Sequence, residues 1–519
     1  MSGQSFIQGT IILILGSLVN RVLGFINGIF MIRIIHPEGI GLFNMIYPVY
    51  TLFLVIASAG IPVAIAKLVA EEVARHNLSG AYRIFRICLV TLILSSTILT
   101  MLYFYGAPFL LKYVFVNPKV YYSFLCLMPG VVIVTLCSAF RGFYQGLQQM
   151  APTALTQCLE QLARVFFGLL IAYLFMPRGV EYAAMGASLG VIIGELTGFI
   201  GILAIYLRNR PRVQPGSAIY SGEPLTSIYG RIFSLAYPVT LTRCISTSLI
   251  WADTILIPLR LQAGGTGLSE ATNLFGQFFG ISANLLFSPG IITISLATAL
   301  LPAMSDAMAL GNLAAVRARC AQAIRVTILA GAPCAMVLFL LAREICGIVF
   351  GYPEAGASLA ILALGGPFLY LWQTTTGILQ GLDEASRPLR NLLLASIFKI
   401  IGIYYLTALP QFGIRGTAAA FVAGYLLMAL FNLADIKRLT KVNFNLHNYQ
   451  KPLVAVVGMG LVITSTQSYL YTCSHSAPLA TIGAICTGFA AYLTILIICG
   501  EIKINDLRRL KHDLGHFLK

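Results

Sequence analysis

The chain has 519 residues, of which 58% are hydrophobic and 10% are charged, and its formal net charge is +16. A soluble domain carries about 25% charged residues, so the composition excludes a string of soluble domains and favours one polytopic membrane domain. No RNA-binding signature accompanies the positive charge, which fits loops facing an anionic membrane leaflet, and we expect no nucleic-acid partner.

Apolar runs long enough to cross a bilayer recur along the chain and predict an all-α polytopic membrane protein. The first run, residues 9–35, has Arg21 near its middle. A charge at that depth costs ~3 kcal/mol on insertion scales and more than ~10 kcal/mol in simulations, so Arg21 has to face water or an anionic partner. We expect about fourteen spans, at 9–35, 41–66, 84–107, 120–141, 153–176, 182–207, 231–259, 272–301, 318–342, 355–380, 389–409, 416–436, 452–472 and 477–499.

Several of these spans contain proline. Membrane helices tolerate Pro when neighbouring helices or water satisfy the freed backbone groups, and kinked helices around a cavity suit a transporter. We therefore expect bends at some of these positions. They are Pro62, Pro129, Pro238, Pro289, Pro333 and Pro367.

The distribution of Lys and Arg predicts the orientation of the spans. With the N-terminus inside, 23 of the 34 Lys and Arg lie in inner loops or in the C-terminal tail. Positive loops mark the cytoplasmic side, so we expect a multi-pass cell-membrane protein with both termini in the cytoplasm. The outer loops hold only seven basic residues, which are Arg33, Lys112, Lys119, Arg178, Arg260, Arg343 and Arg415.

A weak internal repeat divides the chain. Gln145-Gly146-Leu147 ends the fourth span, and Gln380-Gly381-Leu382 ends the tenth, 235 residues later. A short loop with a Pro follows each, and then a helix with a basic residue at matching depth, Arg164 or Lys399. The shift of six spans gives both halves the same orientation, which predicts a pseudo-twofold axis along the membrane normal and a substrate path between the halves.

This repeat predicts two six-helix lobes and two additional C-terminal helices. The expected parts are an N-terminal lobe at 1–208, a cytoplasmic linker at 209–230, a C-terminal lobe at 231–438, helices 13 and 14 at 439–500, and a basic cytoplasmic tail at 501–519.

Basic residues inside the spans are the candidate substrate-binding groups. Arg21, Arg243 and Lys399 have no acidic residue one turn away. Each therefore either faces a wet cavity or is satisfied by helix-end carbonyls or by the membrane interface. The guanidinium of Arg donates two parallel hydrogen bonds to a phosphate, so a cavity with several Arg would attract a pyrophosphate and repel cationic drugs.

Three carboxylates also lie inside spans. Glu160 stands four residues before Arg164, so the two share a helical face and can pair. Such a pair either neutralises a polar face of the bundle or forms part of a cavity wall. Glu195 and Asp253 are candidate counter-ions, proton sites or sodium ligands, and a carboxylate in a span does not distinguish these roles.

Motifs for catalysis or metal binding are missing from the sequence. It contains no P-loop and no HExxH, and its eleven Cys form no CxxC pair or zinc spacing. We expect neither an enzyme nor a bound cofactor or metal.

Three segments carry a family resemblance. Asn20-Arg-Val-Leu-Gly-Phe-Ile-Asn27 resembles the arginine motif that opens the lipid II flippases of the multidrug/oligosaccharidyl-lipid/polysaccharide export superfamily. The segments Gly60–Glu71 and Arg141–Arg164 are similar to the polysaccharide-transporter branch of that superfamily, in particular to its sporulation-type members. The resemblance covers essentially the whole chain, including six plus six plus two spans.

The resemblance implies a flippase that supplies lipid-linked precursor for spore cortex peptidoglycan. The family's helix-1 arginine, which meets the lipid-linked pyrophosphate, corresponds to Arg21. The second arginine of the lipid II flippases is replaced here by Asn27, a departure from their pyrophosphate grip. Five motif residues are expected in gating or at helix ends, namely Gly60, Pro62, Lys67, Arg141 and Gly146.

The leading hypothesis is export of an undecaprenyl-pyrophosphate-linked oligosaccharide by alternating access, with membrane lipids and cortex peptidoglycan synthases as further partners. Three alternatives stay open at this point. They are a cation-coupled multidrug exporter, a vegetative lipid II flippase and a non-transporting scaffold for cortex synthases.

Overall fold

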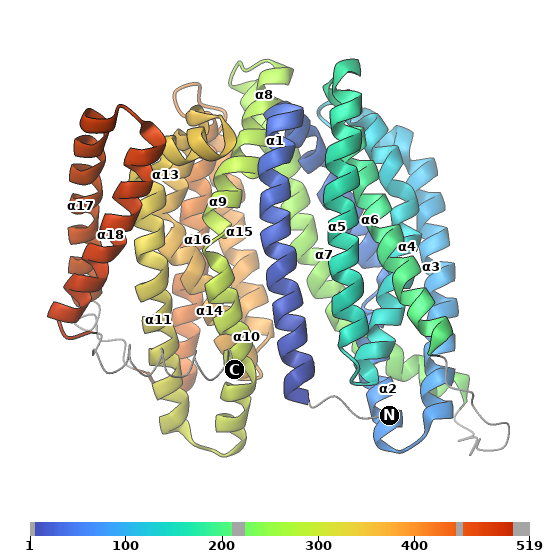
Figure 1. Ribbon diagram of the computed structural model, residues 1–519. Coiled ribbons are helices and arrows are strands. Elements are labelled where there is room, and N and C mark those ends of the chain that lie inside the picture. Colours follow the sequence, from blue (N-terminus) through green and yellow to red (C-terminus); the bar gives the residue numbers. More distant parts are fainter. Residues whose placement is uncertain (1–5, 210–223, 443–449, 502–519) are drawn as a thin grey trace. The chain divides into compact units, whose positions relative to one another are not determined.

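The computed structural model describes residues 6–209, 224–442 and 450–501. All the regular structure in this part of the chain is helical (Figure 1), which confirms the all-α class. The α-helices are α1 (Phe6–Ser58), α2 (Ile61–Ala74), α3 (Leu78–Tyr113), α4 (Tyr121–Gly146), α5 (Ala151–Phe175), α6 (Val180–Arg208), α7 (Leu225–Ala263), α8 (Leu268–Gly276), α9 (Asn284–Phe287), α10 (Gly290–Ala309), α11 (Leu313–Leu340), α12 (Ala342–Ile345), α13 (Gly356–Leu364), α14 (Gly366–Gly381), α15 (Ser386–Leu406), α16 (Ile414–Thr440), α17 (Gln450–Ser474) and α18 (Ala477–Ile498).

Helix α1 is two helices joined at a kink. His36 leaves the helical region, with φ 57° and ψ 168°. It precedes Pro37, and a proline disfavours the α conformation of the residue before it. With α1 and α2 taken as one segment, the described residues contain eleven helices that are long and apolar enough to cross a membrane, or thirteen such segments if each of two bent helix pairs counts as one span. Dividing that segment at His36 adds one span, in agreement with the expected number.

The second expected span, 41–66, is wrong in one respect. The helix ends at Ser58, and α2 starts anew at Ile61. The intervening Ala59 and Gly60 both have positive φ, 43° and 64°. Gly60 tolerates this conformation because it has no Cβ. Pro62 therefore lies in the first turn of a new helix, where proline is favoured, rather than inside a span.

Two expected spans are bent, as proline positions predicted. The segment Leu268–Phe287 meets α10 at 55°, with Pro289 at the break. Pro353–Leu364 meets α14 at 51°, and Pro367 follows that break in the first turn of α14.

The chain forms two compact units. The first comprises residues 1–262 and 266–280, and the second comprises 263–265 and 281–519. Helix α7 begins at Leu225, six residues before the expected span, and belongs to the first unit although the repeat assigns it to the second lobe. The predicted limits of the lobes, based on the repeat, remain a prediction. The tail beyond residue 501 and most of the linker lie outside the described residues.

The first unit is held together around α2, α3, α4 and α6, and the start of α7 completes this core. Ile228, Ile232 and Ala236 of α7 are all buried there. Glycines let α4 approach α2 closely: a Cβ on Gly142 would lie 2.5 Å from the Pro62 carbonyl oxygen, and one on Gly146 would lie 2.7 Å from Val69 Cβ. Small residues are the usual means of close helix packing in membranes.

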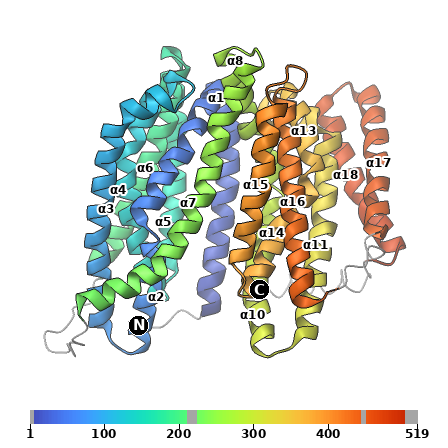
Figure 2. The ribbon, with the colours of Figure 1, turned by 180° about the vertical axis from the view of Figure 1, so that it is seen from behind.

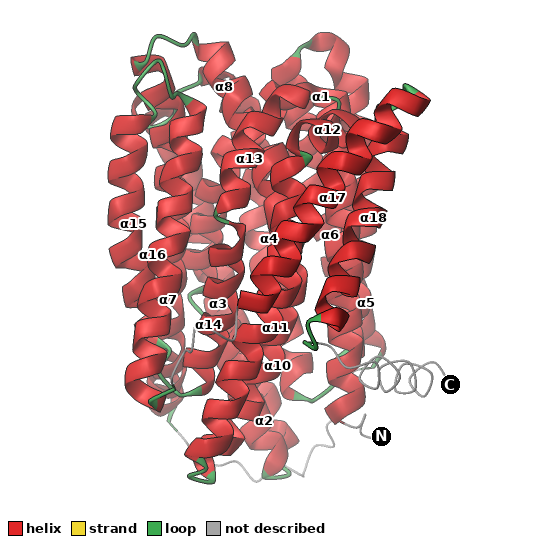
Figure 3. Cartoon of the chain, turned by 90° about the vertical axis from the view of Figure 1, so that its left-hand side faces the viewer, coloured by secondary structure: helices red, strands yellow, loops and turns green. Residues whose placement is uncertain are grey.

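The second unit contains α9 to α18, and α17 and α18 pack on each other and on α11 (Figures 1 and 3). The hydroxyl of Tyr492 donates a hydrogen bond of 2.9 Å to the Leu329 carbonyl. These two helices match the two expected C-terminal spans.

The repeated motif has the same backbone geometry in both units. Helix α4 ends at Gly146 and α14 ends at Gly381, and the turns place Gln148 and Asp383 at φ 58° and 63°. The next helix pair in each unit, α5 and α6 or α15 and α16 (Figure 2), follows the same order.

Candidate functional site

Four charged side chains form a network inside the first unit. Arg141 Nη2 of α4 donates to Glu160 Oε2 of α5 at 2.7 Å. Arg164 Nη2 donates to Glu160 Oε1 at 2.6 Å and to Glu195 Oε1 of α6 at 2.5 Å. The expected pairing of Glu160 with Arg164 is confirmed. The sequence did not predict the pairing of Arg141, which joins α4 to α5 rather than lying at a helix end.

This network is formally neutral and mostly buried. Its side chains are between 11% and 21% exposed. Breaking a buried ion pair by removing one partner costs about 3–5 kcal/mol, because a buried charge is left uncompensated. Two Arg and two Glu can therefore line the interior of a bundle that could not hold any of them alone.

Glycines of α6 make room for the network. A Cβ on Gly194 would lie 2.8 Å from both Arg164 Cβ and the Glu160 carbonyl oxygen. One on Gly198 would lie 3.2 Å from Arg141 Nη2. These glycines repeat every four residues from residue 186, so they form one face of α6 against α5.

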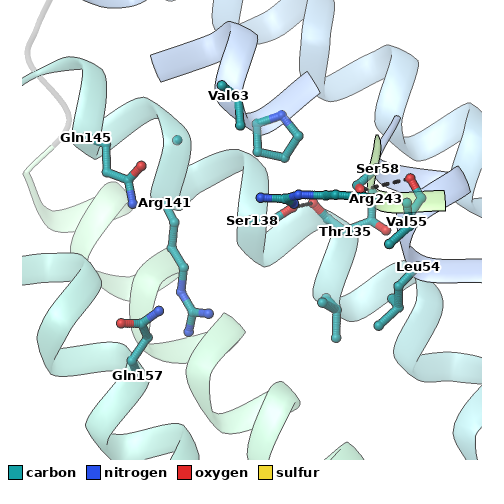
Figure 4. Close-up of a pocket in the computed structure, with 13 residues that line it drawn as sticks. Leu54, Val55, Ser58, Val63, Thr135, Ser138, Arg141, Gln145, Gln157 and Arg243 are labelled. Atoms are coloured by element: carbon teal, nitrogen blue, oxygen red, sulfur yellow. Dashed lines mark hydrogen bonds between the residues drawn. The ribbon is translucent and has the colours of Figure 1, made fainter. Parts of the chain in front are cut away.

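A cavity of about 350 Å³ lies beside this network, wholly within the first unit. Arg243 enters it from α7, and Arg141 lies on its α4 wall (Figure 4). None of the thirteen lining residues is acidic. The neutral polar residues of the wall are Ser58, Thr135, Ser138, Gln145 and Gln157.

Polar atoms at this cavity are available for a ligand. Arg243 forms no ion pair with any described side chain, whereas Arg141 already shares Glu160. Thr135 Oγ1 and Arg141 Nε are buried and have no hydrogen-bond partner among the described residues. Buried polar groups without a partner are rare in native proteins and call for a water or a ligand. The arrangement favours an anionic, hydroxyl-rich molecule.

The structure does not bring Arg21 and Asn27 into this cavity. Arg21 is exposed on α1 and has no ion-pair partner among the described residues. Asn27 is half-buried, and its side-chain oxygen has no hydrogen-bond partner in the described part of the chain. Their role in substrate binding remains a prediction.

Two further predicted site residues are buried elsewhere. Lys399 of α15 is 7% exposed, and its Nζ lies 4.8 Å from the ring centroid of Phe421. Asp253 of α7 is 3% exposed in the first unit. The proposed functions of both remain predictions.

The motif around Gly60 joins α2 to α7. A Cβ on Gly60 would lie 2.5 Å from the Ala236 carbonyl oxygen. Farther along the same two helices, Arg231 Nη2 lies 2.6 Å from Glu71 Oε2. Lys67 is exposed on α2. Gly60 and Pro62 therefore fix a turn at the edge of the cavity, and a gating role for this turn is still a prediction.

Sequence reasoning missed a second polar network, in the second unit. Asp435 of α16 is 3% exposed and accepts hydrogen bonds from Arg390 Nη2 and Asn391 Nδ2, both at 2.8 Å. Asn391 also donates a hydrogen bond to Asn432, which in turn donates hydrogen bonds to the hydroxyls of two threonines of α14. The sequence feature that could have predicted this network is Asp435, a carboxylate near the end of the expected span 416–436.

The described residues contain no cluster of three His, Cys, Asp or Glu that could hold a metal. The described geometry gives no support for cofactor binding. The candidate site therefore consists of the ion network and the basic cavity.

Comparison with known proteins identifies the family. The sequence profile described as "Polysaccharide biosynthesis protein" matches residues 6–308, and the one described as "Lipid II flippase MurJ" matches residues 283–496. Stage V sporulation protein B of Bacillus subtilis (strain 168) is 31% identical over 514 residues, 98% of each chain. The chain belongs to the polysaccharide biosynthesis protein family. This confirms the polysaccharide-transporter resemblance.

Other similar proteins are flippases and transporters. Lipid II flippase MurJ of Bacillus subtilis (strain 168) is 23% identical to this family member over 89% of each chain. The solved inward closed form of lipid II flippase MurJ superposes with a TM-score of 0.72 at 16% identity, covering 94% of this chain and 98% of that one. An inward-facing multidrug resistance MATE family transporter superposes with a TM-score of 0.64 at 15% identity. The match covers 81% of this chain and 96% of that one.

The two structural likenesses establish the fold, which is that of multi-pass membrane transporters. This polysaccharide biosynthesis family member is therefore a multi-pass membrane protein. The side of the membrane on which its termini lie remains a prediction.

Proposed function

We propose that this protein is a flippase for a lipid-linked oligosaccharide, moving a peptidoglycan precursor of the undecaprenyl-pyrophosphate type from the inner to the outer leaflet. The observation that carries the proposal is the first unit's cavity, which is lined by Arg141 and Arg243 and by no carboxylate. Family membership and the names of the relatives support the same substrate class.

The cavity supplies two kinds of recognition. The Arg243 guanidinium provides paired donors that match phosphate oxygens. The hydroxyls and amides of the wall can exchange hydrogen bonds with sugar hydroxyl groups. A cationic drug would meet only positive charge on these walls, which makes the small-molecule exporter the weaker alternative.

We propose alternating access as the mode of transport and spore cortex synthesis as the process it serves. The sporulation assignment draws on the 31% identity with Stage V sporulation protein B. The alternative is a lipid II flippase of vegetative cells, since lipid II flippase MurJ is also a relative.

The decisive experiment follows a fluorescent lipid II analogue in proteoliposomes that contain the full chain. We expect the wild type to move the analogue to the opposite leaflet, and Arg243→Ala to slow this at least about tenfold, since a hydrogen bond to a charged group contributes about 1.5–3 kcal/mol. Arg243→Lys, which keeps the charge but not the planar fork, should be intermediate. Arg86→Ala serves as the matched control, because Arg86 is exposed on α3 and away from the cavity.

Arg21 needs a separate test. If Arg21→Ala and Arg21→Glu both leave flipping and cortex synthesis normal at unchanged protein level, Arg21 is no part of a phosphate site. A well-folded wild type that moves no lipid II analogue would overturn the proposed substrate.

Two alternatives have their own tests. Proton- or sodium-dependent drug efflux that is lost in Asp253→Asn would support a cation-coupled exporter. A scaffold for cortex synthases predicts that deleting residues 501–519 abolishes function while cavity variants remain active. The flippase proposal predicts the reverse.

A further inference from the structure

A second cavity, of about 810 Å³, lies wholly in the second unit. Helices α11 and α17 end beside it, at Leu340 and Ser474, and α18 begins there at Ala477. Figures 1 and 2 show the α17–α18 turn at the same side of this unit as the end of α11. The polar residues that line this cavity are Arg343, Glu344, Gln467, Ser468, Tyr471 and Thr481.

This cavity contains one positive and one negative group that do not pair. Arg343 and Glu344 are consecutive residues of α12, and consecutive residues of a helix point in different directions. Neither side chain forms an ion pair or a hydrogen bond with another described residue. Both charges are therefore available to a ligand, at two separate places on the wall.

Helix α17 adds neutral hydrogen-bonding groups. Gln467 and Tyr471 are four residues apart and so share a face of that helix. Ile348, Pro353 and Ala480 supply apolar surface in the same cavity. A ligand that suits this lining has a zwitterionic head and an apolar remainder.

The position of the cavity along the membrane-spanning helices indicates that its ligand is a lipid. Three membrane-spanning helices terminate around it, so it lies at the level where the apolar core of the bilayer gives way to headgroups. Tyr469 and Tyr471 are 69% and 55% exposed at the end of α17. Exposed tyrosines gather at this level of membrane proteins.

We propose that this cavity binds the headgroup of a zwitterionic phospholipid, with its phosphate on Arg343 and its ammonium on Glu344. The planar guanidinium matches phosphate oxygens, and the volume is within the range of small-molecule sites. The site is independent of the transport cavity, because every lining residue belongs to the second unit.

Native mass spectrometry of the full-length protein in detergent tests the proposal. Phosphatidylethanolamine and phosphatidylglycerol with identical acyl chains serve as probes, together with soluble glycerophosphoethanolamine. We expect phosphatidylethanolamine to bind about tenfold more tightly than phosphatidylglycerol, which has no ammonium. Arg343→Ala should weaken both lipids about tenfold, whereas Glu344→Gln should weaken phosphatidylethanolamine alone.

Matched variants separate the site from general charge effects. Arg415→Ala and Glu354→Gln change exposed charges of the same unit that do not line the cavity, and both should leave lipid binding unchanged. If Arg343→Ala does not fold, Arg343→Gln provides the same test, because it removes the charge but keeps a polar side chain. Equal binding of the two lipids by the wild type would overturn the proposal, as would unchanged binding by the Arg343 variants. Binding of glycerophosphoethanolamine as tight as that of the lipid would show that the occupant is a soluble zwitterion.

Discussion

The fifth helix of each repeat carries a largely buried cation at a matching position, but the surroundings of the two cations differ. In the first unit, Arg164 of α5 is neutralised by Glu160 and Glu195. In the second unit, Lys399 of α15 lies over the ring of Phe421 on α16. A glycine of the sixth helix faces the cation in both cases, Gly194 in one and Gly424 in the other.

The sequence shows where the two repeats diverge. The residue four positions before Lys399 is Ala395, where Arg164 has Glu160. Gly424, which faces Lys399, is followed by Tyr425, whereas Gly194, which faces Arg164, is followed by Glu195. The second unit has its buried carboxylate, Asp435, near the end of α16 instead. A shared backbone can therefore hold an ionic network in one repeat and an aromatic contact in the other, and the ionic repeat borders the basic cavity.

Removing the central carboxylate should give the largest effect. Glu160→Gln keeps the shape of the side chain but leaves the Arg141 guanidinium without its ion-pair partner. We expect the free energy of unfolding to fall by about 3 kcal/mol, the cost of breaking a buried pair. Unfolding in mixed micelles measures this change. Glu354→Gln, at an exposed carboxylate, should change it by less than about 0.5 kcal/mol. A Glu160→Gln protein as stable as the wild type would mean that the network contributes nothing to stability.

The facing glycines offer a matched pair. A Cβ on Gly194 would lie 2.8 Å from Arg164 Cβ and from a backbone oxygen, whereas one on Gly424 would lie 3.3 Å from Lys399 Cβ. Gly194→Ala should therefore lower the free energy of unfolding by about 1–3 kcal/mol, the cost of overpacking. Gly424→Ala should cost less than about 1 kcal/mol, because a side chain can shift more easily than a backbone. Equal losses in thermal unfolding would show that the two interfaces are equally tight.

Lys399 should be less important for stability than its counterpart. Lys399→Met removes a cation–π contact of about 1–2 kcal/mol but also removes the cost of burying a charge. We expect the free energy of unfolding to change by less than about 1 kcal/mol. A loss as large as that of Glu160→Gln would show that Lys399 is held by a network as strong as that of Arg164.

The loops before the two fifth helices should respond differently to pH. In the loop before α15, Arg387 Nε donates to Glu384 at 2.9 Å and so lowers the pKa of Glu384 below its ordinary value of 4.5. A lowered carboxyl pKa gives stability that is present above pH 4.5 and is lost as the pH falls through the lowered pKa. The repeat places Gln149 at the matching position before α5.

Hydrogen exchange can compare these two loops. We expect the protection factors of the first turn of α15 to decrease modestly as the pH falls below 4.5, while those of α5 stay constant. Glu384→Gln should make this decrease in the first turn of α15 smaller. A parallel decrease in both helices would refute the assignment to Glu384.

Local patterns in the sequence predicted the parts of the fold that depend on nearby residues. Hydropathy located the spans, and the spacing of Glu160 and Arg164 predicted their pairing. The i, i+4 rule cannot predict that Arg141 joins Glu160 across nineteen residues, or that Glu195 joins Arg164 across thirty-one, because those contacts depend on how α4, α5 and α6 pack. Arg243 could be selected as a charge in a span, but the cavity that it lines exists only in three dimensions.

The sequence also could not predict that α7 belongs to the first unit. Counting spans in sixes places α7 at the start of the second repeat, whereas the burial of Ile228, Ile232 and Ala236 against α2, α3, α4 and α6 attaches it to the first unit. The tight turn at Gly60, which meets the Ala236 carbonyl, has the same origin.

This attachment of α7 affects the order in which the protein can be made. A growing chain that has released only its first six spans still lacks the buried face of α7, so the core of its first unit remains incomplete until the start of α7 has been synthesised. Domains fold as units from the N-terminus during synthesis. A gene divided in the linker at 210–223 would therefore yield an N-terminal half with an open apolar surface, whereas a division after α7, in the loop before α8, would leave that core whole.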